Sequence, residues 1–315
     1  MYSYENYHKV KEEIEKRRTD AIARADARAE KLRSESEEIR IIDEQLSKTG
    51  LLIFKAACSG GDIAPIREQN KLLNARRGEI LKKMGYPEDY SDIKYFCEKC
   101  SDSGYIGGAK MCSCFHEALV KATIASSGIG DLIEKQSFEN FDLSRFNQDP
   151  KLKAKMSEVL RDAKDYVATF DNKKNNLLLI GTTGTGKTHI STAIARKLIE
   201  KGYDVIYDSI HNIISDFEDD KFKSGYSYTE QKSAKYLECD ILIIDDLGTE
   251  FSNQFTTSCL YNLLNTRINQ GKATIISTNL SGTELSEKYD DRIYSRIVGK
   301  SEIIRFEGND QRLGF

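Results

Sequence analysis

Apolar residues are sparse but regularly spaced over the first fifty positions of the chain. From Glu5 to Lys48 the sequence has no Gly or Pro and is dense in strong helix formers. Small or apolar residues recur there at a spacing of three to four, at Ile22, Ala25, Ala29, Leu32, Ile39 and Leu46, and the stripe is interrupted by Ser36 and Asp43. This pattern predicts a long charged helix with a narrow seam, typical of a coiled-coil hairpin or a partner-binding helix. A solvated helix without a partner is the alternative.

A second helical stretch at about residues 66–84 could fold back on the first through the turn CSGGDIAP. Gly85-Tyr86-Pro87 then ends the helical region, and a cysteine-rich segment and a connector lead to Pro150. We therefore expect an α-helical arm for partner binding at 1–90, a small cysteine module at 91–125, a linker at 126–150 and a final domain at 151–315.

The pattern after Pro150 is that of an α/β fold. A helix-like stretch, LKAKMSEVLRDAKDYVATF, leads into the first of five strand-like runs, which read NLLLI, DVIYD, DILIIDD, ATIIST and EIIRF. Near-continuous apolar strands that alternate with helices indicate a parallel sheet covered on both faces. The fold class expected for this domain is therefore α/β, with a five-stranded parallel sheet.

Composition narrows the possible partners. Lys and Arg number 47 against 50 Asp and Glu, so the net charge is −3 and any nucleic-acid binding has to come from a local patch. No run of 18 apolar residues and no apolar leader occurs, so we expect neither a membrane span nor a secretory signal. A cytoplasmic chain is then the default, in which the seven cysteines are thiols or metal ligands.

Residues 181–188 read G-T-T-G-T-G-K-T and satisfy the phosphate-loop pattern G-x-x-x-x-G-K-[ST]. An apolar strand runs into this loop and a helix leaves it, so backbone N–H groups can surround phosphates at a helix N-terminus. We expect Lys187 to bridge the β- and γ-phosphates and the Thr188 hydroxyl to bind Mg²⁺. The nucleotide-binding residues predicted in and after the loop are Gly181, Thr182, Thr183, Gly184, Thr185, Gly186, Lys187, Thr188 and His189.

About sixty residues later, the apolar run at 241–244 ends in paired acids, Asp245 and Asp246. Such a strand places the first acid near the Mg²⁺ and the second near the attacking water. No N-K-x-D run for guanine recognition occurs, so ATP is the expected nucleotide.

Four cysteines lie within 18 residues: Cys97 and Cys100 form a C-x-x-C pair, and Cys112 and Cys114 form a C-x-C pair. Four thiolates at this spacing fit a tetrahedral Zn²⁺, and such a closed site is structural. The tight second pair leaves His116 as a reserve ligand. A redox pair or unrelated thiols are the alternatives.

A basic and aromatic stretch follows the second predicted strand. Lys221, Lys223, Tyr226 and Tyr228 mix cations with rings, a combination that holds single-stranded DNA by phosphate contact and base stacking. A solvated helix and loop with packed tyrosines is the competing interpretation.

These motifs resemble the AAA+ ATPases, and among them the DnaC/DnaI-type replicative helicase loaders and the IstB-type transposition helpers. The resemblance covers about residues 126–315 and includes SFENF, GTTGTGKTH, IIDDLG, ISTN, DDRIYSRI and FEGNDQR. It implies that Asn279 orients the water between Asp246 and the γ-phosphate. It also implies that Arg296, or Arg292 one helical turn earlier, is an arginine finger for a neighbouring subunit, and that Arg312 is the sensor-2 arginine.

Two departures from the wider AAA+ pattern refine this expectation. The acidic strand carries Asp-Asp in place of Asp-Glu, so Asp246 reaches less far and slow hydrolysis is expected. Nine residues follow Phe306, too few for the usual C-terminal helical lid. Both departures are shared with the helicase loaders. Closure over ATP then requires a neighbour, so ATP is expected to act as an assembly switch.

The resemblance therefore implies an ATPase that loads a hexameric replicative helicase. By the same resemblance, the N-terminal arm and zinc module would bind the helicase. The AAA+ domain would bind single-stranded DNA, self-associate with ATP, and hydrolyse ATP slowly until a partner or DNA stimulates it. The alternatives are an IstB-type transposition helper, which we would not expect to carry the cysteine cluster, and a metabolic kinase, for which no substrate lid remains.

Overall fold

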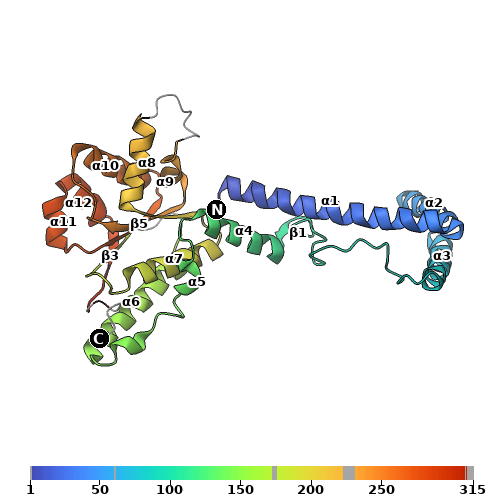
Figure 1. Cartoon of the computed structure of the whole chain (residues 1–315), viewed down its shortest axis with the longest axis horizontal. Helices are drawn as coiled ribbons and strands as arrows, with labels where there is room; N and C mark the ends of the chain where they lie inside the picture. The colour runs from blue at the N-terminus through green and yellow to red at the C-terminus, as the bar shows by residue number, and fades with distance from the viewer. Residues whose placement is uncertain (1, 60–61, 172–175, 223–230, 309, 311–315) are drawn as a thin grey trace. The chain divides into compact units, whose positions relative to one another are not determined.

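A computed structural model describes residues 2–59, 62–171, 176–222, 231–308 and 310 of the chain. The chain forms two compact units, which we call the arm unit and the sheet unit. The arm unit comprises residues 9–116, and the sheet unit comprises residues 1–8 together with 117–315. Both units are shown in Figure 1, and their secondary structure is described below one unit at a time.

Three helices make up most of the arm unit: α1 (Tyr4–Glu35), α2 (Glu37–Ser59) and α3 (Ala64–Lys83). The single helix predicted from Glu5 to Lys48 is thus divided at Ser36. The Ser36 hydroxyl accepts a hydrogen bond from the Ile39 N–H (3.3 Å) and so competes with the helical pattern of the backbone. The second predicted stretch packs against α2, and their shared core contains Leu32, Ile39, Ile42, Ile80 and Leu81.

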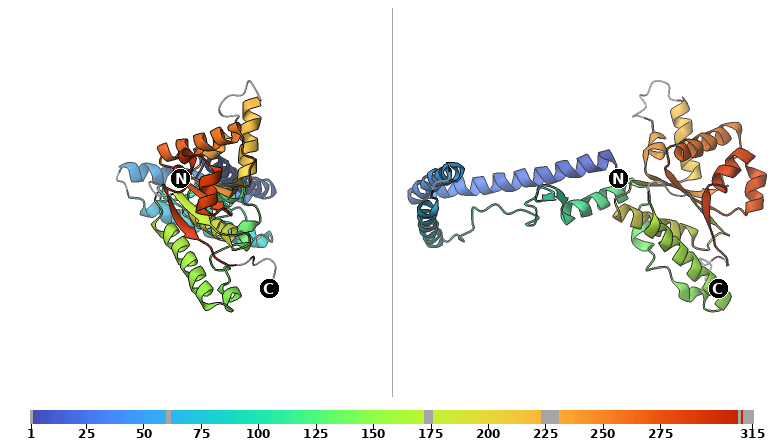
Figure 2. Two further views of the ribbon diagram at one scale, coloured as in Figure 1. Left: turned by 90° about the vertical axis from the view of Figure 1, so that its left-hand side faces the viewer. Right: turned by 180° about the vertical axis from the view of Figure 1, so that it is seen from behind.

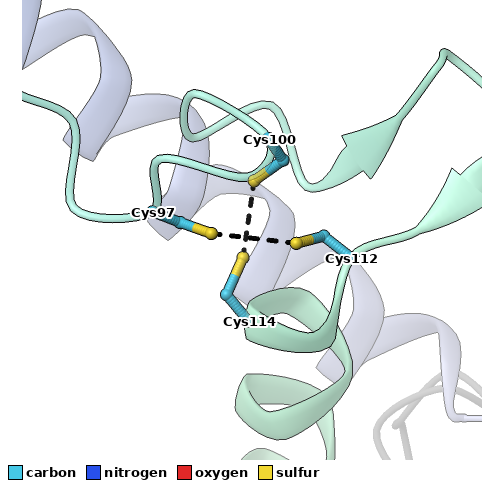
Figure 3. A group of neighbouring side chains, drawn as sticks. All are labelled: Cys97, Cys100, Cys112 and Cys114. Carbon is cyan, nitrogen blue, oxygen red and sulfur yellow. Dashed lines mark hydrogen bonds between the residues drawn. The ribbon is translucent and has the colours of Figure 1, made fainter.

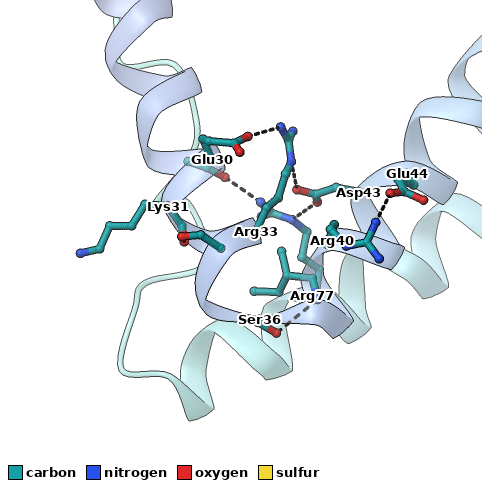
Figure 4. A network of polar contacts seen from close by, with 11 residues as sticks. Glu30, Lys31, Arg33, Ser36, Arg40, Asp43, Glu44 and Arg77 are labelled. Carbon is teal, nitrogen blue, oxygen red and sulfur yellow. Dashed lines mark hydrogen bonds and ion pairs between the residues drawn. The ribbon is translucent and has the colours of Figure 1, made fainter.

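Asp43, which interrupts the predicted apolar seam, is paired with two arginines. Its carboxylate lies 2.8 Å from Nε of Arg77 on α3 and 3.2 Å from Nε of Arg33 on α1. Figure 4 shows the three side chains converging where the helices meet. The side chain of Asp43 is only 12% exposed, so the second arginine helps to offset the cost of burying its charge.

The remainder of the arm unit is the cysteine segment. A two-stranded antiparallel ribbon, β1 (Tyr105–Ile106) and β2 (Lys110–Met111), separates the two cysteine pairs. Helix α4 (Ser113–Ser126) follows directly and carries the chain into the sheet unit.

The sheet unit contains the five predicted parallel strands, which the structure confirms with shifts of a residue at most ends. They are β3 (Asn176–Ile180), β4 (Val205–Ser209), β5 (Ile241–Leu247), β6 (Ala273–Thr278) and β7 (Ser301–Arg305). Their order in the sheet is β4-β5-β6-β3-β7, with every neighbouring pair parallel. Because β6 lies between β3 and β5, the ends of these three strands meet at one edge.

Helices cover both faces of this sheet, as the near-continuous apolar strands predict. On one face, Leu177 and Leu179 of β3 pack with α6 (Pro150–Thr169) and α7 (Lys187–Glu200). On the other face, Leu178 and Ile180 pack with the helices that follow β4 and β5. Those helices and the remaining short ones are α5 (Leu132–Lys135), η1 (Leu143–Phe146), α8 (Ile210–Phe222), α9 (Ala234–Glu238), α10 (Gln254–Asn269), α11 (Gly282–Lys288) and α12 (Asp291–Ile297). Figures 1 and 2 show the two layers from several directions.

The described residues beyond β7, 306–308 and 310, form no helix. Within the described part of the chain, no helix is both long and apolar enough to cross a membrane.

The start of β4 holds a carboxyl group in an unfavourable environment. Burial, and secondarily the charge of Asp240, raise the pKa of Asp204 to about 6. In the unfolded chain this pKa is about 3.9. The charged form of Asp204 therefore destabilises the fold above pH 6, and this penalty disappears as the pH falls through 6 toward 4.

We predict that Asp204→Asn raises the free energy of unfolding of the sheet unit at pH 8, by up to about 3 kcal/mol. The gain should shrink steadily between pH 6.5 and 4, because wild-type Asp204 becomes protonated there. Denaturant unfolding across this pH range measures the difference. Asp165→Asn, at an exposed site on α6, is the matched control and should show no such trend. A gain independent of pH would contradict the assignment.

Candidate functional site

The phosphate loop lies between β3 and α7, as its sequence predicts. Gly184 and Gly186 have φ angles of +75° and +100°, which favour glycine. A Cβ atom at Gly184 would also lie 1.7 Å from a carboxylate oxygen of Asp310, so the segment after β7 passes close beside the loop. The Thr182 hydroxyl donates to the Gly308 carbonyl (3.1 Å) in the same region. Both the backbone conformation and the crowding explain the glycines here.

Lys187 is only 5% exposed, and its ammonium group is held by oxygen atoms. Its Nζ donates to the carbonyls of Gly181 (2.7 Å) and Thr182 (2.8 Å) and to Oδ1 of Asn279 (2.6 Å). Asn279 directly follows β6, so the strand order brings this predicted residue to the loop. The ammonium therefore points along the loop, toward the position where phosphates would bind.

Asp245 is held on both carboxylate oxygens. Oδ2 accepts from the Tyr207 hydroxyl at 2.5 Å and lies 3.4 Å from the Thr188 hydroxyl. Oδ1 accepts from the Ser277 hydroxyl, which in turn accepts from the N–H of Asp246 at 3.1 Å. Thr188 and Asp245, the two predicted Mg²⁺ ligands, thus face each other.

Asp246 has an unusual backbone conformation for a residue with a side chain. Its φ angle is +56°, and the register between β5 and β6 shifts between Ile244 and Leu247. A left-handed aspartate at a strand end is a form of local strain that is often found at functional sites. Thr249 donates its hydroxyl to the Asp246 carbonyl (2.8 Å) and supports this bend.

These residues surround a cavity of about 420 Å³. Its lining includes Thr183, Gly184, Gly186, Lys187, Thr188, His189, Asp246 and Asn279. A neighbouring cavity of about 320 Å³ is lined by Thr185, Asn140, Phe141 and other residues of the connector. The first cavity offers cations, N–H groups and acids suited to a metal-bound polyphosphate. The second offers rings and amides suited to a base.

The sequence reasoning missed several residues of this site. Ser277 and Tyr207 contact Asp245, and Gln136 and Arg145 line both cavities. No motif identifies them, although Ser277 and Tyr207 each lie one residue before the last of a predicted strand, where side chains face the site.

Arg296 lies away from the phosphate loop and packs on α10. Its guanidinium donates to Oδ1 of Asn265 (2.7 Å) and to the Tyr261 hydroxyl (3.2 Å), and it stacks 4.4 Å from the centre of the Tyr261 ring. Its Nη1 donates to the carbonyl of Arg292 (2.9 Å). The expected arginine finger is therefore not brought to the nucleotide site of its own chain.

Of the predicted DNA-contacting residues, the structure describes only Lys221. Lys221 lies near the end of α8 with its Nζ 4.5 Å from the centre of the Phe255 ring. Lys223, Tyr226, Tyr228 and Arg312 lie outside the described residues.

The four predicted cysteines come together in the arm unit. Their sulfur atoms all lie within 4.8 Å of one another, with Cys97 and Cys112 3.7 Å apart and Cys100 and Cys114 3.5 Å apart. Figure 3 shows the thiols converging on a common centre. Four sulfurs at 2.3 Å from a tetrahedral zinc would be about 3.8 Å apart.

The chemistry of this donor set also fits a metal. A backbone hydrogen bond from Cys100 lowers the pKa of Cys97 to about 7, whereas burial raises the pKa of Cys114. The four sulfur donors themselves, and not their protonation in the free protein, are what suit a metal such as zinc. His116 is not part of the group. The cluster therefore fits the four-cysteine set without the reserve ligand.

The sequence matches a known protein family. The profile of the family described as "IstB-like ATP binding protein" matches residues 125–314, more than half of the chain and all of the site in the sheet unit. The chain belongs to this family. Membership in an ATP-binding family agrees with the assembled phosphate loop, and it identifies ATP as the nucleotide.

Curated relatives of this IstB-like protein include the phage-like element PBSX protein XkdC of Bacillus subtilis. It is 29% identical over 239 residues, which cover 70% of this chain and 85% of the relative. The replicative helicase loader DnaC of Escherichia coli K12 is 27% identical over 194 residues, 61% of this chain and 76% of DnaC. Among solved structures, the crystal structure of DnaI is 21% identical, covers 59% of this chain and 95% of that one, and has a TM-score of 0.46.

For this IstB-like site, we predict that Lys187→Ala weakens ATP affinity at least about tenfold, because it removes the charge that meets the phosphates. Asp246→Asn should instead keep ATP affinity within about twofold and abolish turnover, because it leaves the loop intact and removes a carboxylate base. Fluorescent-nucleotide titration and phosphate release measure the two effects. Equal loss of affinity in both variants would contradict these separate roles.

Proposed function

We propose that this protein is an ATP-dependent loader of a hexameric replicative helicase. The observation that supports this most is the match to DnaC along 76% of its length, in a chain whose phosphate loop, acidic strand and Asn279 are assembled around one cavity. The proposal has three parts: an ATP switch in the sheet unit, a partner-binding arm unit, and a DNA-contacting segment after α8.

In the ATP switch, the backbone of residues 181–186 surrounds the phosphates and Lys187 bridges the β- and γ-phosphates. Thr188 and Asp245 would hold Mg²⁺, which would neutralise charge on the phosphate oxygens. Asp246 accepts the proton of the attacking water, and Asn279 orients that water. Lys187 donates to the amide oxygen of Asn279, which directly follows β6. A γ-phosphate that binds Lys187 would therefore change this contact and, through it, the end of β6.

Hydrolysis by the isolated chain is expected to be slow. The carboxylate of Asp246 is one methylene shorter than that of a glutamate, and its left-handed backbone fixes the direction of the side chain. A partner or DNA that shifts this short strand end would change the rate, so ATP would act chiefly as a switch between bound states.

The finger is supplied in trans in this proposal. Arg296 of one subunit leaves its contacts with Asn265 and Tyr261 and meets the γ-phosphate bound by a neighbour. Self-association of the loader with ATP follows from this arrangement, since each site is completed by the next subunit. Arg312 provides the sensor-2 contact.

The arm unit holds the helicase, and its cysteine cluster binds a structural Zn²⁺. The four thiolates leave no open coordination position, so the ion stabilises the fold and takes no part in the reaction. Lys221, Lys223, Tyr226 and Tyr228 bind single-stranded DNA by phosphate contact and stacking.

A second candidate function is an IstB-type transposition helper. The matched family profile favours it, since it carries that name and covers residues 125–314. The cysteine cluster lies outside this range and supports the loader.

We predict that the full-length tagged chain, purified from its own cells with ATP and Mg²⁺, retains a hexameric replicative helicase. Omitting the nucleotide should change the amount retained several-fold, because assembly follows the ATP state. Mass spectrometry of the eluates identifies the partner. A transposase in the eluate would instead support the helper.

Arg296→Ala serves as the assembly variant in the same experiment. It should bind ATP normally and lose turnover that depends on assembly, whereas Arg292→Ala, one turn away, tests the alternative finger and should keep that turnover. Undiminished turnover in Arg296→Ala would contradict the role of this arginine.

We also predict one zinc ion per chain, measured by mass spectrometry of the folded protein. Cys112→Ser should lose the metal and lower the melting temperature, because a structural zinc contributes folding free energy directly. Cys259→Ser, at a cysteine outside the cluster, is the control and should keep the metal. A folded wild-type chain without stoichiometric zinc would contradict the site.

A further inference from the structure

Tyr207 is a buried residue that the sequence motifs do not identify. It lies on β4, the edge strand of the sheet, and is 8% exposed. Its hydroxyl donates to Oδ2 of Asp245 at 2.5 Å. The phenol is the donor in this contact, because an ionised carboxylate can only accept.

The backbone of the same residue holds residues 127–128, the linker that follows α4 within the sheet unit. The N–H of Tyr207 donates to the carbonyl of Ser127 at 2.7 Å. Gly128 lies directly on the strand: a Cβ there would come within 2.4 Å of the Tyr207 carbonyl oxygen, and its φ angle is +81°. Ser127 is fully buried, and its hydroxyl donates to the carbonyl of Ile124 (2.8 Å) near the end of α4. The linker is thus held against Tyr207 by a hydrogen bond to its N–H and by the close approach of Gly128 to its carbonyl oxygen.

We propose that Tyr207 is a positioning residue that couples the linker at 127–128 to the Mg²⁺-binding carboxylate of Asp245. The inference rests on the proposed ATPase and adds a route by which the N-terminal part of the chain controls it. The linker fixes the Tyr207 backbone, and the Tyr207 hydroxyl in turn fixes Oδ2 of Asp245. Ser277 holds the opposite oxygen, so Oδ2 is the oxygen whose orientation depends on Tyr207.

The chain itself connects this linker to the cysteine cluster. Helix α4 begins at Ser113, between the cluster residues Cys112 and Cys114, and ends at Ser126, one residue before the linker. A partner that binds the arm unit and displaces α4 would therefore move the linker. Partner binding would thus change how Asp245 coordinates Mg²⁺.

The first test is Tyr207→Phe, which removes only the hydroxyl. We expect kcat for ATP to fall about tenfold, as for other partners of metal ligands. KM for ATP should stay within about twofold. The Kd for Mg²⁺ of the chain loaded with a non-hydrolysable ATP analogue, measured by calorimetry without turnover, should rise several-fold. Tyr166→Phe, at a buried tyrosine in the same core, is the matched control. An unchanged Kd for Mg²⁺ would overturn the positioning role, since loss of packing alone does not alter it selectively.

The second test addresses the linker. Gly128→Ala and Gly130→Ala both place a side chain at a positive φ, but only the first meets the Tyr207 carbonyl. A Cβ at Gly130 would meet no described atom within 4 Å other than those of its chain neighbours. We expect Gly128→Ala to reproduce the kinetics of Tyr207→Phe, and the double variant to be no worse than either single one. Gly130→Ala should keep wild-type kinetics.

Additive effects of Gly128→Ala and Tyr207→Phe, or equal effects of the two alanines, would overturn the coupling. If Gly128→Ala does not fold, Tyr207→Phe still decides the role of the hydroxyl. A wild-type chain that does not hydrolyse ATP overturns the proposed function and this inference with it. An active wild type with an unaffected Tyr207→Phe overturns only the inference.

Discussion

The ammonium group of Lys187 is a positive charge buried at the edge of a sheet, and the arrangement of the sheet unit depends on accommodating it. Burying a charge is costly unless polar groups replace the lost water. Here the carbonyls of Gly181 and Thr182 and the amide oxygen of Asn279 do so. This requires β6 to lie directly beside β3, which in turn places the acidic strand next to the loop on the far side of β6. The strand order is thus what brings the oxygen atoms to the buried ammonium group.

Most of the sheet unit could be predicted from sequence because its signals are local. The apolar runs define the strands, and the spacing of Gly181, Gly186 and Lys187 identifies the loop without knowledge of distant contacts. The grouping of the cysteines could also be predicted, because two close pairs so near each other favour a shared centre. These features depend on short-range chemistry that a single sequence carries in full.

The remainder depends on long-range contacts. Nothing near Tyr207 in the sequence indicates that its hydroxyl meets Asp245, because the two lie on neighbouring strands 38 residues apart. The break at Ser36 could not be predicted from local sequence. The Ser36 hydroxyl bond can interrupt a long run of helix-forming residues here because the helix after it, α2, packs into its own apolar core. Arg296 is a related case: its sequence context suggests a finger, and its packing on Tyr261 shows the position it takes within its own chain.

The pairing of Asp43 with Arg33 and Arg77 also has an evolutionary consequence. One carboxylate serves guanidinium groups from two other helices at the point where α1 gives way to α2. Loss of the aspartate alone leaves two cations facing each other, and loss of one arginine leaves a half-neutralised acid in a nearly dry corner. Single substitutions at these sites should therefore destabilise the arm unit. Among homologous chains, the three positions should vary together as a set or be replaced together by apolar residues.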